Sequence, residues 1–383
     1  MRIALLARRI APDGGMEAHA AWLARTLAAR GHDVTVVTAS PPTAGFDLEA
    51  QRLTVARVES PITGWSTAWY SGAARIVEAI RPDLVVAEST AAGPIVDRWP
   101  TVTQLYGNHW NELAGIWSVW GRRRARHAVR RTAALVVDYV RWRPRRIAHG
   151  AVVALTERDA RRARLLYGVP AGRVTVLANP VSKRFTSVRM DRQRRIVFAG
   201  RLDPGKGPEL LIPAFAQSRG RELGYTLEFA GDGPLRSALT KGAQRAGIED
   251  AVVFHGRLGQ SELAELLGSA TVACFPSVRR ESFSIALIEA LAAGCAVICS
   301  EPAGLQDVID HPLAASTSSA PGTIVREHSA RAWSAAMNSL ICDSGATASQ
   351  SAAGRLVASG FDEDRIASAL EQLYRSVAAA ADN

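Results

Sequence analysis

The chain has 383 residues, of which 48% are hydrophobic, and carries a formal net charge of +10. This length exceeds what one hydrophobic core serves, so two domains are expected. No run of about 18 uncharged apolar residues occurs, which argues against a membrane-spanning helix. The apolar stretch at the N-terminus is too short for a signal peptide, and we therefore expect a cytoplasmic protein.

Short apolar runs alternate with helical patterns over the first half of the chain. A strand is expected at 2–7, and it is followed by a helix at 14–31, whose apolar residues recur at helical spacing and which Gly31 ends. Further strands are expected at 33–38, 83–88, 101–106, 151–156 and 174–179. Such a βα series predicts a parallel sheet that helices cover on both faces.

The pattern restarts after a polar linker at 182–194. Strands are expected at 196–200, 225–231, 251–256, 271–277 and 295–300, each separated by a helical segment. We predict an α/β protein with two doubly wound Rossmann-like domains, at 1–185 and 186–360, that face a central ligand-binding cleft. An amphipathic helix at 361–383 is expected to pack back on the first domain.

The four cysteines form no CxxC pair, and we expect them to be small apolar core residues rather than metal ligands. They are Cys274, Cys295, Cys299 and Cys342. The Asp-x-Asp sequence that begins at Asp362 opens the last helix, where helix capping explains it better than metal binding. We therefore expect no metal site.

The segment "GRLDPGKG" at 200–207 follows an expected strand and precedes a helix. It satisfies the GxxxxGK part of a P-loop, but Gly207 stands where a P-loop has the Ser or Thr that binds magnesium. Exposed glycine amides, a helix N-terminus and the charges of Arg201 and Lys206 would still favour an anion. The alternative is a flexible loop with no ligand.

The segment "PSVRRESFSIALIEALAAG" at 276–294 places two carboxylates beside a helix start. Ser282 and Ser284 can cap the helix and leave amides free for an anion. Glu281 precedes the helix and could reach a polyhydroxyl group, while Glu289 could accept from paired hydroxyls such as those of a ribose. The alternative is that Glu289 lies on the exposed face of an ordinary helix.

Together these segments resemble the retaining glycosyltransferases of family 4, which have the GT-B fold. The resemblance rests on "AGRLDPGKGPELLIPAF", "FAGDGPLRSAL", "VVFHGRLGQSELAELLGSATVACFPS" and "ESFSIALIEALAAGCAVI", in the family's order and spacing. Weaker matches are "GGMEAHAAWLARTLAARGHDVTVVT" and "FDEDRIASALEQLY". The resemblance thus spans nearly the whole chain and is most specific in the second domain.

The resemblance implies a role for each charged residue of the second domain. Glu281 would contact hydroxyls of the transferred sugar, and Glu289 would hold the ribose of the nucleotide. Arg201 and Lys206 would bind the diphosphate. Amides near Ser284 and Ile285 would bind its distal phosphate.

In the first domain the resemblance is weaker. Gly14 and Gly15 match the glycine loop that faces the donor phosphates in this family. His109, in "LYGNHWNE", follows an expected strand where the family often has a histidine near the sugar. His19 is expected to be a surface or packing residue. In "ANPVSKRF", Asn179 precedes proline rather than the usual glycine, so no role is carried over to it.

Residues 121–146 hold ten arginines and one acid, Asp138, a net +9. Two interpretations stay open: a solvated helical face, or a surface that docks on an anionic membrane at its inner face or on a phosphate-bearing lipid. The arginines assigned to such a surface are Arg122, Arg123, Arg124, Arg126, Arg130 and Arg131. The run has few interleaved aromatic residues and lies inside a domain, so nucleic-acid binding is not expected.

The predicted function is transfer of a sugar from a UDP- or GDP-sugar to a hydroxyl of a glycan, lipid or small-molecule acceptor, with no further cofactor. The predicted catalytic residues are His109, Arg201, Lys206 and Glu281. The alternatives are a sugar-nucleotide epimerase or a sugar phosphorylase of the same fold. A P-loop-like NTPase is a further alternative, against which Gly207 argues.

Overall fold

The computed structural model divides into two compact units. Unit 1 holds the described residues up to Asn179 and again from Asp364, and unit 2 holds those from Pro180 to Glu363. In the structure, unit 1 therefore ends at Asn179, whereas the sequence pattern placed the end of the first domain at 185. The described residues are 1–10, 15–39, 53–60, 67–89, 91–106, 129, 132–133, 136, 150–188, 190–279, 281, 283–301, 305–309 and 311–380.

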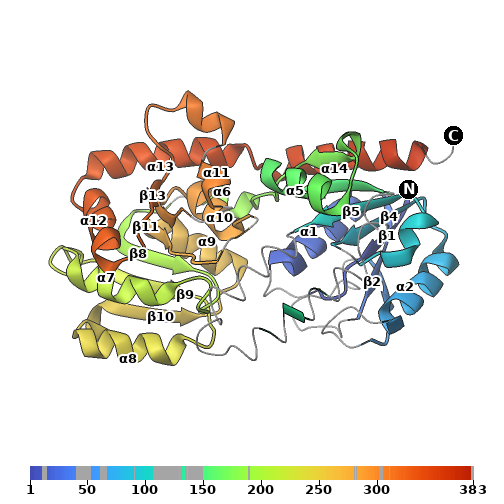
Figure 1. The fold of residues 1–383 in the computed structure, drawn as a ribbon. Coiled ribbons are helices and arrows are strands. Elements are labelled where there is room, and N and C mark those ends of the chain that lie inside the picture. Colours follow the sequence, from blue (N-terminus) through green and yellow to red (C-terminus); the bar gives the residue numbers. More distant parts are fainter. Residues whose placement is uncertain are drawn as a thin grey trace. The chain divides into compact units, whose positions relative to one another are not determined.

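Unit 1 is built on a seven-stranded sheet in which all paired strands are parallel, in the order β3-β2-β1-β4-β5-β6-β7. The strands are β1 (Arg2–Leu6), β2 (Asp33–Thr38), β3 (Thr54–Arg57), β4 (Leu84–Glu88), β5 (Thr101–Leu105), β6 (Ala151–Ala154) and β7 (Val174–Val176). The helices are α1 (Gly15–Ala29), α2 (Thr67–Ile80), η2 (Gly93–Asp97), α5 (Glu157–Tyr167), η3 (Ala171–Arg173) and α14 (Glu363–Ala379). Figure 1 shows helices on both faces of this sheet.

Successive side chains of a strand point to opposite faces of the sheet, so those of unit 1 face one or the other of its two helical layers. Val85 and Ala87 of β4 pack in a core with Trp69 of α2. The Trp69 indole also donates to the carbonyl of Ala91 at 2.9 Å. On the opposite face, Gln104 of β5 donates to the hydroxyl of Tyr374 in α14 at 2.8 Å. One face is thus apolar, and the other includes polar contacts.

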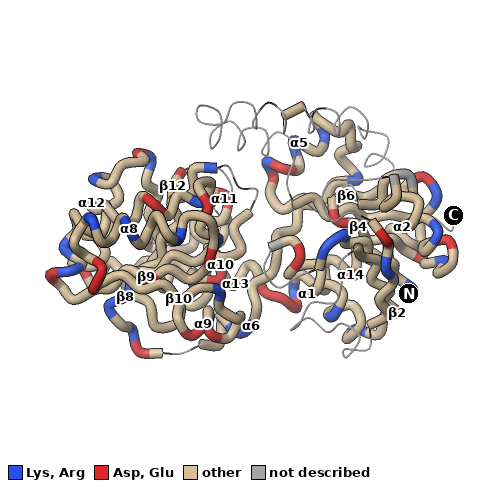
Figure 2. The backbone as a smooth tube through the Cα atoms, turned by 90° about the horizontal axis from the view of Figure 1, so that it is seen from below, with Lys and Arg blue, Asp and Glu red and all other residues tan. Residues whose placement is uncertain are grey.

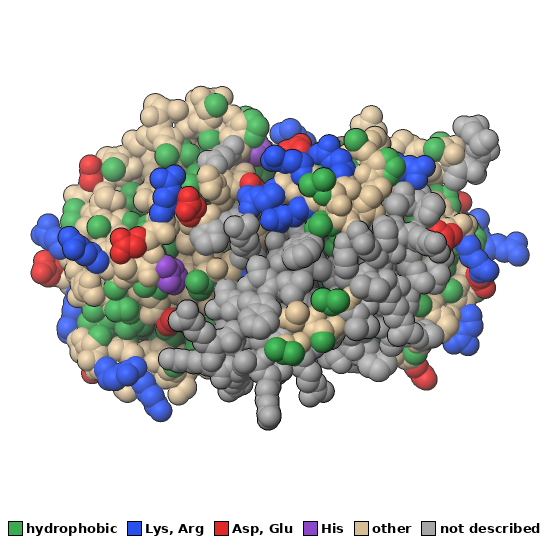
Figure 3. Space-filling model, in the orientation of Figure 1, with side chains coloured by type: hydrophobic (Ala, Val, Ile, Leu, Met, Phe, Trp, Pro, Cys, Tyr) green, Lys and Arg blue, Asp and Glu red, His purple; other side chains and the backbone are tan. Residues whose placement is uncertain are grey.

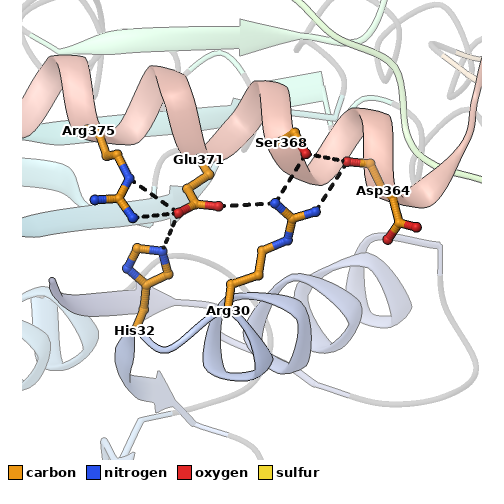
Figure 4. A network of polar contacts seen from close by, with 6 residues as sticks. All are labelled: Arg30, His32, Asp364, Ser368, Glu371 and Arg375. Carbon is orange, nitrogen blue, oxygen red and sulfur yellow. Dashed lines mark hydrogen bonds and ion pairs between the residues drawn. The ribbon is translucent and has the colours of Figure 1, made fainter.

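Helix α14 is joined to unit 1 by a network of charged residues (Figure 4). Glu371 accepts from Arg30 at 3.1 Å and from Arg375 at 2.6 Å, and it lies 3.2 Å from the His32 ring. Hydrogen bonds from Arg375 and Arg30 lower the pKa of Glu371 to about 2. Burial lowers the pKa of His32, so its ring is neutral near pH 7.

Unit 2 has a six-stranded parallel sheet in the order β10-β9-β8-β11-β12-β13. Its strands are β8 (Gln193–Ala199), β9 (Thr226–Ala230), β10 (Val252–Gly256), β11 (Ala270–Phe275), β12 (Ala296–Ser300) and β13 (Thr323–Val325). Its helices are α6 (Lys183–Ser187), η4 (Pro208–Leu210), α7 (Leu211–Gln217), α8 (Arg236–Ala246), η5 (Glu249–Ala251), α9 (Gln260–Ser269), α10 (Ile285–Ala293), α11 (Leu305–Ile309), η6 (Pro312–Ser316), α12 (Ala330–Ile341) and α13 (Ser344–Ser359). The predicted pair of doubly wound parallel sheets is therefore confirmed.

A single guanidinium fixes the C-terminal ends of α9 and α10. Arg192 donates to the carbonyls of Leu267 at 3.2 Å, Ala270 at 2.5 Å, Ala293 at 2.8 Å and Gly294 at 2.6 Å. These carbonyls belong to helix ends, which lack intrahelical donors and attract positive charge. Arg192 therefore anchors the helix that carries Glu289.

Charged residues of both signs are interspersed along both units (Figure 2). Large hydrophobic side chains that are exposed, such as Met16, Leu165 and Val253, are far apart in the sequence. On the face drawn in Figure 3, apolar side chains lie among polar ones over the described surface. None of the helices in the described parts of the chain is both long and apolar enough to span a bilayer.

Candidate active site

The candidate site lies where the strand order of unit 2 reverses. Strands β8 and β11 are neighbours, and the chain leaves them toward opposite edges of the sheet. Ligands of open α/β sheets bind at the carboxyl ends of strands at such a point. The segments singled out from the sequence, 200–207 and 276–294, follow these two strands.

The two segments contact one another through their backbones. The amides of Val278 and Arg279 both donate to the carbonyl of Gly205 at 3.0 Å. Gly207 has φ +65°, and a Cβ there would lie 2.2 Å from the carbonyl oxygen of Pro276. Only glycine allows both this conformation and this approach. Gly207, which replaces the magnesium-binding residue of a P-loop, thus lets the segments meet.

Asp203 organises the first segment, although it was not among the residues predicted from the sequence. Its Oδ1 accepts from the amides of Gly205 at 2.8 Å and Lys206 at 3.2 Å, while its Oδ2 accepts from Arg201 at 2.6 Å. The expectation that glycine amides in this segment are exposed to an anion is therefore wrong for Gly205. The sequence signal that could have identified Asp203 is an aspartate before Pro-Gly, because aspartate side chains in turns accept hydrogen bonds from nearby backbone amides.

Glu281 and Lys206 form an ion pair across the two segments. Lys206 Nζ lies 2.6 Å from Glu281 Oε2, and the side chains are 26% and 9% exposed. The other carboxylate oxygen accepts from the Ser277 hydroxyl. Ser300, at the end of β12, in turn donates to the Ser277 carbonyl at 2.6 Å. The structure thus brings together the predicted Lys206 and Glu281 and adds two serines that no motif had indicated.

Helix α10 begins at Ile285 with Ser284 as its N-cap residue, but the Ser284 hydroxyl makes no capping hydrogen bond. The predicted Ser284 side-chain cap is therefore wrong, whereas Ser282, the other predicted cap, lies outside the described residues. The first-turn amides have no intrahelical partner, and among the described residues Ser284 provides no side-chain cap for them. A helix N-terminus in this state favours a bound anion.

Glu289 is 6% exposed, so the alternative of an exposed helix face is excluded. Burial raises its pKa to about 7, and a hydrogen bond with the Gln260 side chain opposes this shift. Gln260, on the neighbouring helix α9, was not anticipated from the sequence. Glu289 lies among apolar residues of α10, and with a pKa of about 7 both its protonated and its ionised form are populated near neutral pH.

Several sequence-derived residues fall outside the described part of the chain. They are Gly14, His109, Ser282 and the arginines Arg122, Arg123, Arg124, Arg126, Arg130 and Arg131. Gly15 is the first residue of α1. His19, expected at the surface or in packing, is buried, and burial lowers its pKa to about 3.

Among the described residues, no group of three or more His, Cys, Asp or Glu side chains could hold a metal ion. Cys274, Cys295 and Cys299 are buried, as expected of core residues, but Cys342 is exposed. The expectation of a core position is wrong for Cys342 because it follows the end of α12 at the surface.

Two Rossmann-like units, with a basic loop and a helix start at the switch point of the second, are the arrangement of the GT-B class of protein. Matches to known families agree: the chain belongs to the family described as Glycosyl transferases group 1, which matches residues 182–373. Residues 13–184 match the family described as Glycosyltransferase Family 4. The predicted family and fold are thus confirmed, and the chain is a member of a transferase family.

Curated relatives have a range of names. A D-inositol 3-phosphate glycosyltransferase of Jonesia denitrificans is 30% identical over 254 residues, 60% of this chain and 58% of that protein. A glycogen synthase of Mycobacterium tuberculosis is 28% identical over 214 residues, 55% of this chain and 50% of that protein. The chain thus spans less than two thirds of the length of these relatives.

Solved structures support the fold over nearly the whole chain. Anabaena HepE, solved with UDP and glucose, has a TM-score of 0.74 at 19% identity and covers 98% of this chain and 100% of its own. WaaG, a glycosyltransferase involved in lipopolysaccharide biosynthesis, has a TM-score of 0.72 at 17% identity, with 97% and 99% covered. At these identities the likeness establishes the fold alone.

Proposed function

We propose that this protein transfers a sugar from a nucleoside diphosphate sugar to an acceptor hydroxyl, with retention of configuration at the anomeric carbon. The observation that carries the proposal is the Lys206–Glu281 pair at 2.6 Å, just before the start of α10, whose N-cap residue Ser284 makes no side-chain cap. A diphosphate needs cations and amide donors, and a sugar ring needs a carboxylate. Retention is inferred from membership of the family.

In the proposed reaction, the bond between the anomeric carbon and the diphosphate oxygen breaks, the acceptor oxygen bonds the anomeric carbon, and the proton of the acceptor hydroxyl leaves with the departing diphosphate. Negative charge develops on the departing diphosphate. Lys206 has three N–H donors, so its bond to Glu281 leaves two for phosphate oxygens. Arg201, whose side chain is 64% exposed, is accessible to the same group. Such placed charges stabilise the transition state without reorganisation.

Glu289 is proposed to accept hydrogen bonds from the ribose hydroxyls, and amides near Ser284 and Ile285 to bind the distal phosphate. Gly14, Gly15 and His109 remain candidates from the sequence, with His109 placed near the transferred sugar. The donor is proposed to be a UDP- or GDP-sugar. The structure of HepE with UDP and glucose supports the uridine nucleotide. No metal is required in this scheme, because the site's own cations neutralise the diphosphate.

A panel of UDP-, GDP- and ADP-sugars tests this function. The protein should hydrolyse at least one of them slowly, and activity should survive EDTA. Chromatography of the products separates transfer from the alternatives, since an epimerase returns an isomeric nucleotide sugar and a phosphorylase needs phosphate and releases a sugar 1-phosphate. Absence of binding and turnover with every donor would refute the proposal.

The acceptor is proposed to be a glycan, lipid or small molecule, and the arginine-rich segment 121–146 suggests an anionic membrane surface at the inner face. Sedimentation with vesicles that contain anionic lipid, at low and high salt, tests the membrane part. Binding should weaken in salt and should fall when Arg122, Arg123, Arg124 and Arg126 are changed to Gln together. A protein that stays in the supernatant at low salt would contradict membrane docking.

A further inference from the structure

A buried carboxyl group without a partner ends strand β4 of unit 1. Glu88 is 8% exposed, and its Oε1 atom is buried with no hydrogen-bond partner among the described residues. Other buried acids differ: Asp159 accepts from the Thr156 hydroxyl at 3.1 Å, and Glu228 accepts from Thr226 at 2.7 Å. Because buried polar groups are nearly always hydrogen-bonded, Glu88 calls for an explanation.

Glu88 belongs to a polar layer between the sheet and helices α1 and α14. Val85 and Ala87 face the apolar core beside α2, so alternation directs Glu88 to the opposite face. Its register partner on β5 is Gln104, which bonds Tyr374 of α14. Two residues after Gln104, the Tyr106 hydroxyl lies 2.5 Å from Nδ1 of His19 in α1. Glu88 is thus beside polar groups that contact one another, and the Tyr106 hydroxyl and the His19 ring each have hydrogen-bonding capacity beyond the one contact between them.

Glu88 lies at the edge where open α/β sheets generally bind ligands. Strand β4 adjoins β1, where the strand order of unit 1 reverses, and Glu88 is at its carboxyl end. The next residue, Ser89, has φ +49°, a left-handed conformation that is costly for a residue with a Cβ. A buried unpaired acid followed by a strained residue weakens the fold, and such costs concentrate at functional sites.

The charge state of the group limits what it can bind. Burial, and then the neighbouring Glu17, raises the pKa of Glu88 well above its usual value, which favours the protonated form of this carboxyl. A neutral carboxyl can both donate and accept a hydrogen bond, as a hydroxyl can. Glu17, which pairs with Arg9 at 3.2 Å, adds negative charge nearby and disfavours an anionic group.

We propose that Glu88, together with Tyr106 and His19, forms a subsite that binds a hydroxyl of a neutral polyhydroxyl acceptor, such as a sugar or cyclitol ring. The inference rests on the proposed transferase function, whose acceptor it describes. It assigns Glu88 to binding the acceptor through its hydroxyls rather than through a phosphate. The missing partner of Oε1 is then supplied by the acceptor.

Direct binding tests the proposal without knowledge of the natural acceptor. Saturation-transfer NMR titrations with myo-inositol, methyl α-glucoside and inorganic phosphate would compare the wild-type protein with Glu88→Met and Glu88→Gln. At least one neutral polyol should bind the wild type, and Glu88→Met should weaken it about tenfold, the effect of a hydrogen bond near the upper end of its usual range. Glu88→Gln, which keeps a donor and an acceptor, should remain within a few-fold of wild type. Phosphate binding should not depend on Glu88.

Glu78→Leu serves as the control, because Glu78 is an exposed residue of α2 that pairs with Arg98 and lies outside the polar layer. It should leave polyol binding unchanged. Glu88→Met should melt at or above the wild-type temperature, since it removes an unpaired buried polar group. A variant that fails to fold would therefore contradict the proposal, as would polyol binding that is absent or insensitive to Glu88.

Calorimetry with UDP and GDP on the same proteins separates this inference from the proposed function. Nucleotide binding by the wild type and by Glu88→Met, with no effect of Glu88 on polyols, would refute the acceptor subsite alone. Loss of all nucleotide binding in the wild type would refute the transferase assignment instead.

Discussion

Replacing Glu289 by Gln should make the protein more stable and its donor binding weaker. Burial raises the folded-state pKa of Glu289 from 4.5 to about 7. A raised pKa contributes stability that is fully present below the unfolded-state value and is lost as pH rises through the folded-state value. A rise in pKa from 4.5 to about 7 corresponds to roughly 3 kcal/mol lost by pH 8. Glu289→Gln avoids this loss, so its free energy of unfolding should exceed wild type at pH 8 and match it at about pH 4, below the unfolded-state pKa.

Donor binding should depend on pH in the opposite direction. If ionised Glu289 accepts the ribose hydroxyls, protonation competes with binding, and the Kd should rise about tenfold from pH 8 to pH 6. The diphosphate diester of a nucleotide sugar stays ionised over this range and adds no slope. Calorimetry with UDP- or GDP-glucose, whichever binds, measures the Kd. In Glu289→Gln the Kd should be higher at pH 8 and independent of pH.

The control is Glu265→Gln, an exposed residue of α9, which should change neither stability nor affinity. A wild-type Kd that is flat between pH 6 and pH 8 would refute the argument, as would an equal slope in Glu289→Gln. Unchanged stability at pH 8 would show that ionisation of the buried carboxyl is not costly.

Three further predictions concern the cations of the site and the helix ends. Lys206→Ala should lower turnover by a factor on the order of 100–1000 with an unchanged circular dichroism spectrum, because it removes charge stabilisation of the leaving group; near-normal turnover in steady-state assays would exclude Lys206 from catalysis. Arg192→Lys should lower the free energy of unfolding in urea by about 1–3 kcal/mol, because an ammonium cannot reach four carbonyls; an unchanged midpoint would show that Arg192 does not anchor α10. Because the pKa of His32 is lowered, and that of Glu371 is lowered to about 2, stability should fall as pH drops below about 6.5 and again from about 4.5 toward 2. Thermal unfolding followed against pH should lose the second step in Glu371→Gln, and persistence of that step would contradict its assignment to Glu371.

The helices, strands and motif-bearing loops could be predicted from the sequence because the residue patterns that indicate them are local. Apolar runs of strand length, separated by helical periodicity, predict a parallel sheet wherever they occur. The spacing of Lys206, Glu281 and Glu289 could also be compared with a family. These signals placed Lys206 and Glu281 in the same site, and the structure brings them to 2.6 Å.

The rest depends on partners that are distant in the sequence. Gln104 and Tyr374 are 270 positions apart, and no periodicity predicts that they meet. The role of Asp203 depends on which amides its loop turns inward. That Oε1 of Glu88 has no hydrogen-bond partner among the described residues can be recognised only from the structure, since a glutamate at the end of an apolar strand is equally compatible with an exposed turn.

The chain order of unit 1 has a consequence for its synthesis. Along the chain, unit 2 lies between the strands of unit 1 and the last helix of unit 1. The segments that enter and leave unit 2 contact one another, since the Val181 amide donates to the Phe361 carbonyl at 2.8 Å. A ribosome that adds about 5–20 residues per second needs roughly 10–40 s to continue from Asn179 to the C-terminus. Throughout that interval the nascent sheet lacks α14, and Gln104 lacks Tyr374. The sheet of unit 1 therefore precedes its last helix by the whole synthesis of unit 2, and its α14 face stays uncovered over that time.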